Sequence, residues 1–185
     1  MRKSRQEAAE TRERIVESAS TRFRENGIDG TALADLMAQA GLSHGGFYKH
    51  FGSKEQVVLE SLELASDTLR ETMSSALTRK SGINAAVADY LSPEHRDNAG
   101  AGCPFVALSS ELARSSDEVR TAATAGIERL VELFAGNLDE PPAAARKQAL
   151  VMLSTMIGAL TLARMVNEPA LSDTILREAR KALAQ

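Results

Sequence analysis

The sequence has few aromatic residues and almost no cysteine. Aromatic residues make up 4% of the 185 positions, tryptophan is absent, and Cys103 is the single cysteine. One cysteine cannot form a disulfide within the chain, so a disulfide-stapled secreted fold is excluded and a reducing cytoplasm is the expected compartment. Alanine and leucine are abundant instead, and both favour helices.

Long apolar runs are missing as well. The charged N-terminal segment has no apolar stretch of the kind found in signal peptides. The most apolar run, residues 149–163, is 15 residues long and includes Ser154, Thr155 and Thr161. A bilayer-spanning helix needs ~20 mostly apolar residues, so this run predicts a buried helix and no membrane partner.

An overall excess of positive charge is also lacking. The net charge of −3 excludes a generally basic nucleic-acid binder, although residues 1–55 carry a net +1 and the remainder a net −4. Specific DNA binding needs only one positive face, so a local DNA-binding surface stays possible. Arg2, Lys3 and Arg5 form a basic arm that either reaches phosphates or a minor groove, or is a solvated tail.

No run of alternating β-branched residues is present, and helical spacing dominates, which predicts an all-α fold. A loop rich in Gly, Pro, Asn and Asp interrupts the pattern at residues 92–104. About nine helices are expected, near residues 7–26, 31–41, 43–51, 53–77, 83–91, 104–114, 116–137, 142–166 and 170–183.

Residues 41–45 spell G-x-S-x-G, the nucleophile elbow of α/β-hydrolases, with Ser43 as its serine. That elbow needs a buried strand leading into the serine, but residues 31–40 are strong helix formers, so a hydrolase is not expected. His44 and His50 lie ~240° apart around a helix and cannot share a metal ion as i, i+4 histidines can. No catalytic residue, metal site or cofactor is predicted.

Residues 31–51 are better explained as two helices joined by a short glycine-containing turn, a helix-turn-helix. Phe47 and Phe51 are spaced i, i+4 and would anchor the second helix to the core, which leaves its other faces free to meet DNA. Gly45 and Gly46 each lower the stability of a helix by ~1 kcal/mol relative to alanine. They either permit close approach to a groove or simply loosen the turn.

Three motifs indicate a family. Residues 19–27 show A-x-x-x-F-x-x-x-G, residues 40–43 show an A-G-L-S turn, and residues 47–55 show F-Y-x-H-F-x-S-K-E. With them, residues 11–60 resemble the DNA-binding domain of the TetR family of bacterial transcriptional regulators. The resemblance implies a three-helix helix-turn-helix domain in residues 1–55 and a helical ligand-binding and dimerisation domain in residues 56–185.

The resemblance also implies roles for single residues. It assigns phosphate contacts to Tyr48, His50 and Lys54, helix N-termini to Thr31 and Ser43, and base contacts to His44, Gly45, Gly46 and Lys49. Helix N-termini and lysine are suited to phosphate. The sequence His44-Gly45-Gly46 departs from the family's usual Lys-Gly followed by a small or β-branched residue, so its base preference is not carried over.

The helix expected at residues 142–166 is apolar almost all round, which indicates burial on most sides. In TetR-like proteins two such helices from each subunit form a four-helix interface. The resemblance therefore implies a homodimer and a palindromic operator, and a monomer with a central helix is the alternative. The residues expected at the interface are Leu153, Ile157, Gly158, Leu160 and Arg164.

Cys103 precedes a helix, where the helix dipole lowers a thiol pKa, so it is either a sensor of oxidants and electrophiles or a small buried apolar residue. The other candidate signal is a small apolar inducer. The pocket expected for it is lined by Phe105, Leu108, Met152 and Met156.

Together these features predict a dimeric, cytoplasmic repressor that a small-molecule inducer releases from double-stranded DNA. The alternative is a repressor switched at Cys103. A small helical enzyme and a helical interaction module that does not bind DNA are two further classes. Residues 53–77 belong to both domains and are the expected lever between them.

Overall fold

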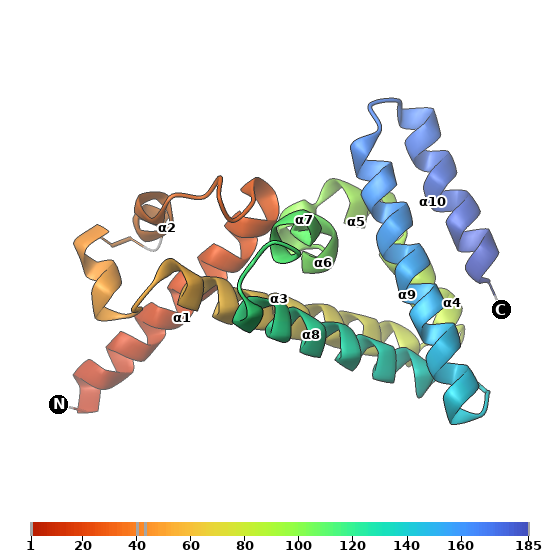
Figure 1. Cartoon of the computed structure of the whole chain (residues 1–185), viewed down its shortest axis with the longest axis horizontal. Helices are drawn as coiled ribbons and strands as arrows, with labels where there is room; N and C mark the ends of the chain where they lie inside the picture. The colour runs from red at the N-terminus through yellow and green to blue at the C-terminus, as the bar shows by residue number, and fades with distance from the viewer. Residues whose placement is uncertain (1, 40, 43, 185) are drawn as a thin grey trace.

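The computed structural model describes residues 2–39, 41–42 and 44–184, and all regular structure within these residues is helical. The all-α prediction is therefore confirmed. The N-terminal helices lie at one end of the molecule and the last two helices at the other, with two long helices running between them (Figure 1).

The N-terminal part consists of α1 (Arg2–Asn26), α2 (Leu33–Gln39), the 3-10 helix η1 (His44–Lys49) and α3 (Lys54–Leu77). Gly27 ends α1 with φ of 81°, a backbone conformation that glycine adopts without strain. The Ser53 hydroxyl accepts a hydrogen bond from the Gln56 N–H, so α3 begins with the expected cap.

One apolar cluster holds these elements together. Phe47 and Phe51 stack with their ring centroids 5.6 Å apart, and both rings are buried. Each buried apolar side chain of this size contributes ~1.5–3 kcal/mol by leaving water. Other buried members include Ile15, Ala19, Phe23, Leu36, Met37 and Val57.

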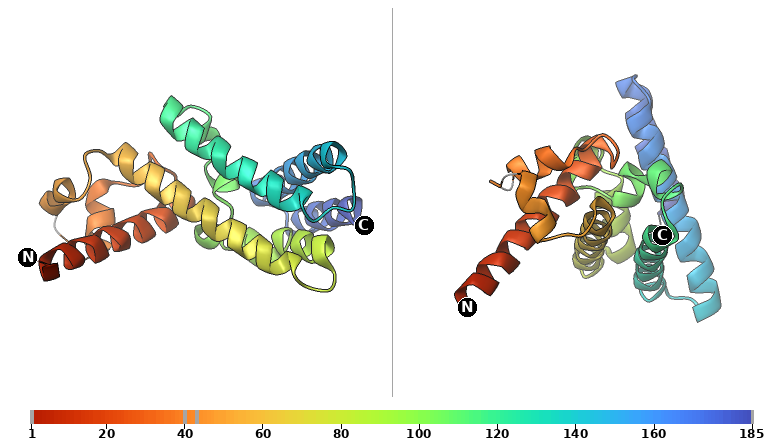
Figure 2. Two further views of the ribbon diagram at one scale, coloured as in Figure 1. Left: turned by 90° about the horizontal axis from the view of Figure 1, so that it is seen from below. Right: turned by 60° about the vertical axis from the view of Figure 1, so that its left-hand side comes forward.

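The rest of the chain forms seven more α-helices and a second 3-10 helix within the described residues. They are α4 (Gly82–Tyr90), α5 (Pro93–Asp97), η2 (Ala99–Ala101), α6 (Pro104–Ala107), α7 (Ser109–Leu112), α8 (Asp117–Ala135), α9 (Pro142–Met165) and α10 (Pro169–Leu183). Helices α3 and α8 pack side by side, and α9 packs on both α8 and α10 (Figure 2).

Two sequence predictions needed refinement. The loop expected at residues 92–104 contains α5 and η2, because Ser92 caps α5 and Pro93 suits its first turn. The single helix expected at residues 104–114 is divided at Leu108, whose φ of −115° and ψ of 10° leave the helical region. The consequence is a short α7 that stands apart from α6.

Helix α9 is long and apolar enough to cross a membrane by length and composition, a test that core helices also pass. It buries one side, on which Leu153 and Leu160 lie in the core of the subunit. Its other side exposes 63% of Val151, 51% of Leu162 and 70% of Met165. The subunit itself therefore buries only one side of α9, and a broad apolar stripe on the other side lacks cover from its own subunit.

Candidate nucleic-acid interface and regulatory sites

The second element of the helix-turn-helix is a single 3-10 helix, η1, rather than an α-helix. Its six residues include Gly45 and Gly46, which favour helix poorly, and short segments readily adopt the tighter 3-10 winding. Phe47 points into the core, while Tyr48 is 68% exposed and its ring meets Phe47 edge-on at 5.2 Å. The packing of Phe47 thus presents Tyr48 outward.

The other predicted DNA contacts differ in exposure. Lys49 is exposed, whereas Gly46 and His50 are half-buried. His44 and Gly45 open η1, and Ser43 lies outside the described residues. The accessible end of η1 therefore combines an aromatic ring with a cation.

Thr31 and Lys54 face inward. The buried Thr31 hydroxyl donates to the Gly27 carbonyl at 2.7 Å, and helix α2 begins two residues later. The Lys54 ammonium donates to the Ile28 carbonyl at 2.5 Å. Both side chains hold the turn between α1 and α2 in place.

Arg12 is a positioning residue that sequence reasoning missed. Its guanidinium forms an ion pair with Glu60 on α3, lies 4.3 Å from the Phe51 ring centroid, and donates to the His50 carbonyl at 3.3 Å. Arg12 therefore joins α1 and α3 to the end of η1. No local motif marks it, because its partners are 38 and 48 residues away in sequence.

Two polar contacts join this region to the C-terminal part. Arg24 on α1 donates to the Gly102 carbonyl at 2.8 Å. On α7, a Glu111 carboxylate oxygen accepts from the Asp29 N–H at 3.0 Å. Because Asp29 lies in the turn that leads into α2, α7 contacts the helix-turn-helix directly.

Cys103 is fully buried, and burial raises the pKa of its thiol. The expected lowering by the helix N-terminus is therefore wrong, since the cost of placing a thiolate in an apolar interior exceeds the local hydrogen bonds. The following helix, α6, has only four residues. Cys103 is a packing residue in this state.

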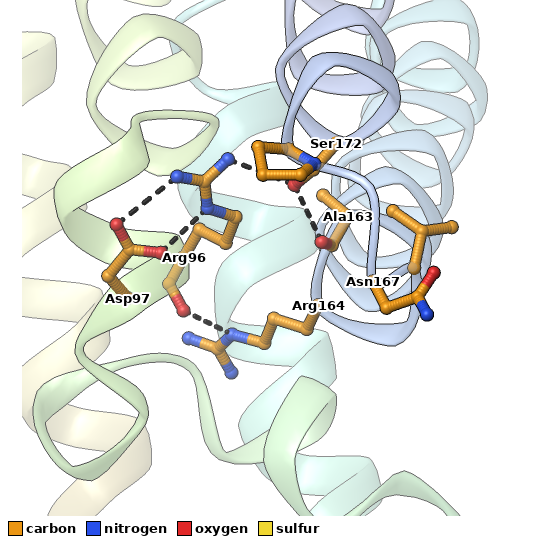
Figure 3. A pocket seen from close by; sticks show the side chains of 8 residues that line it. Arg96, Asp97, Ala163, Arg164, Asn167 and Ser172 are labelled. Atoms are coloured by element: carbon orange, nitrogen blue, oxygen red, sulfur yellow. Dashed lines mark hydrogen bonds and ion pairs between the residues drawn. The ribbon is translucent and has the colours of Figure 1, made fainter.

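A polar network lies beside Cys103. Arg164 donates to the carbonyls of His95 and Arg96, at 2.6 and 2.9 Å, and Arg96 donates to Ser172 at 2.9 Å. Arg96, Arg164 and Ser172 line a cavity of about 280 Å³ between α5, α9 and α10 (Figure 3). Arg164, expected at a dimer interface, ties α9 to α5 within the subunit.

A second cavity of about 300 Å³ lies between α6, α7, α8 and α9. Of the predicted ligand-binding residues Phe105 lines it, whereas Leu108, Met152 and Met156 are buried in the core. Ile157, predicted at the dimer interface, also lines this cavity. We refer to it as the α7 pocket, lined by Phe105, Ser109, Leu112, Ala113, Arg120, Ala123, Thr124, Ile127 and Ile157.

Comparison with known proteins identifies both the N-terminal and the C-terminal part of the chain. Residues 15–61 match the family described as bacterial regulatory proteins, tetR family, and residues 80–179 match the C-terminal domain of LmrA/YxaF-like transcriptional regulators. The chain belongs to the TetR family. This TetR-family protein is thus a DNA-binding transcriptional regulator, as its motifs predicted.

Relatives that match most of the chain agree with this assignment. An uncharacterised HTH-type transcriptional regulator of Mycobacterium tuberculosis is 29% identical over 93% of each chain. The HTH-type transcriptional repressor DhaR of Mycobacterium sp. is 33% identical over 66% of this chain and 63% of its own length. The crystal structure of a TetR regulator from Chloroflexus aurantiacus is 30% identical, with a TM-score of 0.81, and the match covers 100% of this chain and 95% of that chain.

In this TetR-family protein, His95 should make stability depend on pH. Its Nδ1 lies 2.7 Å from the Tyr90 carbonyl, and its Nε2 accepts from the Cys103 N–H at 2.9 Å, so the neutral ring fits the site. Burial lowers the pKa of His95. The unfolded chain therefore binds more protons below its ordinary pKa of about 6.5, and the free energy of unfolding should fall as the pH drops below that value.

Urea unfolding of the wild type and His95→Gln between pH 7.5 and 5.5 checks this prediction. Carboxylates titrate in both proteins, so only the difference between the two pH profiles reports on His95. We expect the wild type to lose more stability on acidification than the variant. Parallel profiles would contradict the prediction.

Proposed function

We propose that the protein is a homodimeric repressor in the cytoplasm, released from a palindromic operator by a small-molecule inducer. The observation that best supports this proposal is that Tyr48 and Lys49 are exposed on a segment that Phe47 and Arg12 fix to the core. The name of the relative DhaR, a transcriptional repressor, supports the repressing role. The proposed division is a DNA-binding unit in residues 1–55 and a regulatory unit in residues 56–185.

The proposed DNA surface is the exposed side of η1. In the proposal Tyr48 and Lys49 contact DNA directly, since both side chains are exposed and an aromatic hydroxyl and an ammonium both donate to phosphate oxygens. The proposal also assigns DNA contacts to His44, Gly45, Gly46 and His50, and Ser43 precedes them in the chain. In the proposal Thr31 and Lys54 stabilise the surface without contacting DNA, because their side chains donate hydrogen bonds to backbone carbonyls.

The proposed dimer surface is the uncovered stripe of α9. Val151, Gly158, Leu162 and Met165 fall within ~60° of one another around the helix. A Cβ placed on Gly158 would have nothing within 4 Å, so a second helix has room to approach there. A large exposed apolar stripe is typical of an interface, and two-fold pairing of α9 would cover it.

The proposed inducer site is the α7 pocket. Ser109 and Leu112 of α7 line this pocket, while Glu111 of the same helix holds the Asp29 N–H. A ligand that shifts α7 would therefore disturb the turn that positions α2, and α3 would carry the same movement along its length. Coupling of this kind is typically worth ~1–3 kcal/mol, or roughly 5-fold to 150-fold in DNA affinity.

Glu111→Ala should loosen this connection. We expect the Asp29 amide to exchange hydrogen for deuterium faster than in the wild type, because its acceptor is removed, while α8 and α9 keep their protection. Hydrogen exchange followed on a peptide covering residues 27–33 measures this. Unchanged exchange in that peptide would show that Glu111 does not hold the turn.

Selection from a random pool of duplex DNA tests the proposed function. A two-fold dimer should enrich an inverted repeat, with half-site centres one helical turn or a multiple of it apart. Enrichment of a single half-site would contradict the dimeric arrangement. Failure to enrich any sequence would contradict specific DNA binding.

A further inference from the structure

The side chains that line the α7 pocket are mostly apolar and include one cation. Six of its nine lining side chains are apolar, two are hydroxyl-bearing, Arg120 is the one cation, and no carboxylate lines it. Hydrophobic walls with a few polar groups that fix orientation are typical of small-molecule sites. The charge of the lining therefore favours a ligand with a single negative group.

Arg120 is available to bind such a group. Its one ion pair among the described residues is with Asp117, with a guanidinium nitrogen 3.4 Å from the carboxylate oxygen, and both side chains are mostly exposed. Exposed ion pairs between residues i and i+3 of a helix contribute little to stability. A ligand carboxylate could replace Asp117 at small cost and accept two parallel hydrogen bonds from the guanidinium.

Close packing of Phe105 against α8 forms one apolar wall of the pocket. Gly126 on α8 lies beneath Phe105, and a Cβ at that position would come within 2.8 Å of the Phe105 ring. Because Gly126 has no side chain, the Phe105 ring can pack directly against α8. Leu112 and Ile157 also line the pocket. An aliphatic or aromatic body would bury its surface against these three side chains.

We propose that the α7 pocket binds a small, mostly apolar monocarboxylate, with its carboxylate on Arg120 and its hydrocarbon body against Phe105, Leu112 and Ile157. A cationic ligand finds no carboxylate in the lining, and a nucleotide or other polyanion would need more than one cation. The volume of about 300 Å³ lies at the small end of ligand pockets and limits the size of the body. The link to DNA release rests on the proposed function, but the binding itself does not.

Calorimetric titration of the full-length protein without DNA tests the assignment. The probes are octanoate and 4-phenylbutyrate, each compared with its primary amide and with the amine of the same chain length. We expect at least one acid to bind about tenfold or more tightly than its amide and amine, because only the acid forms charge-assisted hydrogen bonds. Equal binding of an acid and its amide, or no acid binding tighter than about 1 mM, would overturn the proposal.

Variants locate the site. Arg120→Gln should weaken acid binding about tenfold and leave amide binding unchanged. Thr124→Trp, at an exposed lining position, should fill the pocket and abolish binding. Arg177→Gln, which removes an exposed arginine on α10, is the matched control and should bind like the wild type. Undiminished acid binding by Arg120→Gln would overturn the assignment of the carboxylate.

A separate measurement keeps the two proposals distinguishable. Saturating acid is added to a preformed complex with the selected operator, and dissociation is followed by fluorescence anisotropy. Dissociation supports both proposals. Binding without dissociation supports the ligand assignment and contradicts the role of this pocket in DNA release.

Discussion

Tyr48→Ala is expected to lower operator affinity about one hundredfold. Loss of one hydrogen bond to a charged phosphate costs ~1.5 kcal/mol, or about tenfold, and a dimer loses it in both half-sites. The melting temperature should stay close to that of the wild type, because the Tyr48 side chain is 68% exposed and the core residue Phe47 is untouched. Anisotropy titrations with the selected operator measure the affinity.

Tyr48→Phe is the matched control, because it keeps the ring packed on Phe47 and removes only the hydroxyl. If the hydroxyl contacts phosphate, Tyr48→Phe should lose most of the affinity that Tyr48→Ala loses. If the ring itself makes the contact, the phenylalanine variant should bind like the wild type. An alanine variant with full affinity would remove Tyr48 from the DNA surface.

Placing charges on the uncovered stripe of α9 is expected to lower operator affinity at least as much. Leu162→Glu and Met165→Glu together should convert the dimer to monomers, because two-fold symmetry places the four carboxylates in one apolar interface. Operator affinity should fall more than about one hundredfold, since each half-site must then bind alone. Sedimentation equilibrium and anisotropy report these two effects.

Thr72→Glu is the control for charge alone, because Thr72 is exposed on α3 and lies outside this stripe. It should remain dimeric and bind the operator. Gly158→Phe provides a second test that adds no charge: its side chain has open space within the subunit but would block a closely approaching helix. A double-glutamate protein that remains dimeric would place the interface elsewhere.

The helices themselves were predictable because their signals are local. Caps such as Ser53, stops such as Gly27 and the i, i+4 pair Phe47 and Phe51 each act within one or two turns of the chain. The helix-turn-helix followed from the same short-range spacing. The winding of η1 was missed, because six residues with two glycines carry no clear periodicity.

Contacts between distant segments were not predictable. The Glu111–Asp29 hydrogen bond joins residues 82 positions apart, and the sequence has no pattern that pairs them. The side of α9 that faces the core could not be chosen either, since apolar residues surround the helix and only packing against α8 and α10 distinguishes Leu160 from Leu162.

Cys103 shows why a motif can mislead about chemistry. Its position before a helix predicted a lowered thiol pKa, but that effect requires a helix longer than the four residues of α6 and contact with water. Burial, which sequence alone did not reveal, has the opposite effect and raises the thiol pKa.

The most direct test of a sequence-specific regulator is an anisotropy titration of the protein into the intergenic DNA that flanks its own gene. It is run at several salt concentrations and with excess random DNA as competitor. We predict tight binding that survives the competitor and weakens steeply as salt rises, because phosphate contacts release counterions. Equal affinity for the flanking DNA and for random DNA would contradict the central claim.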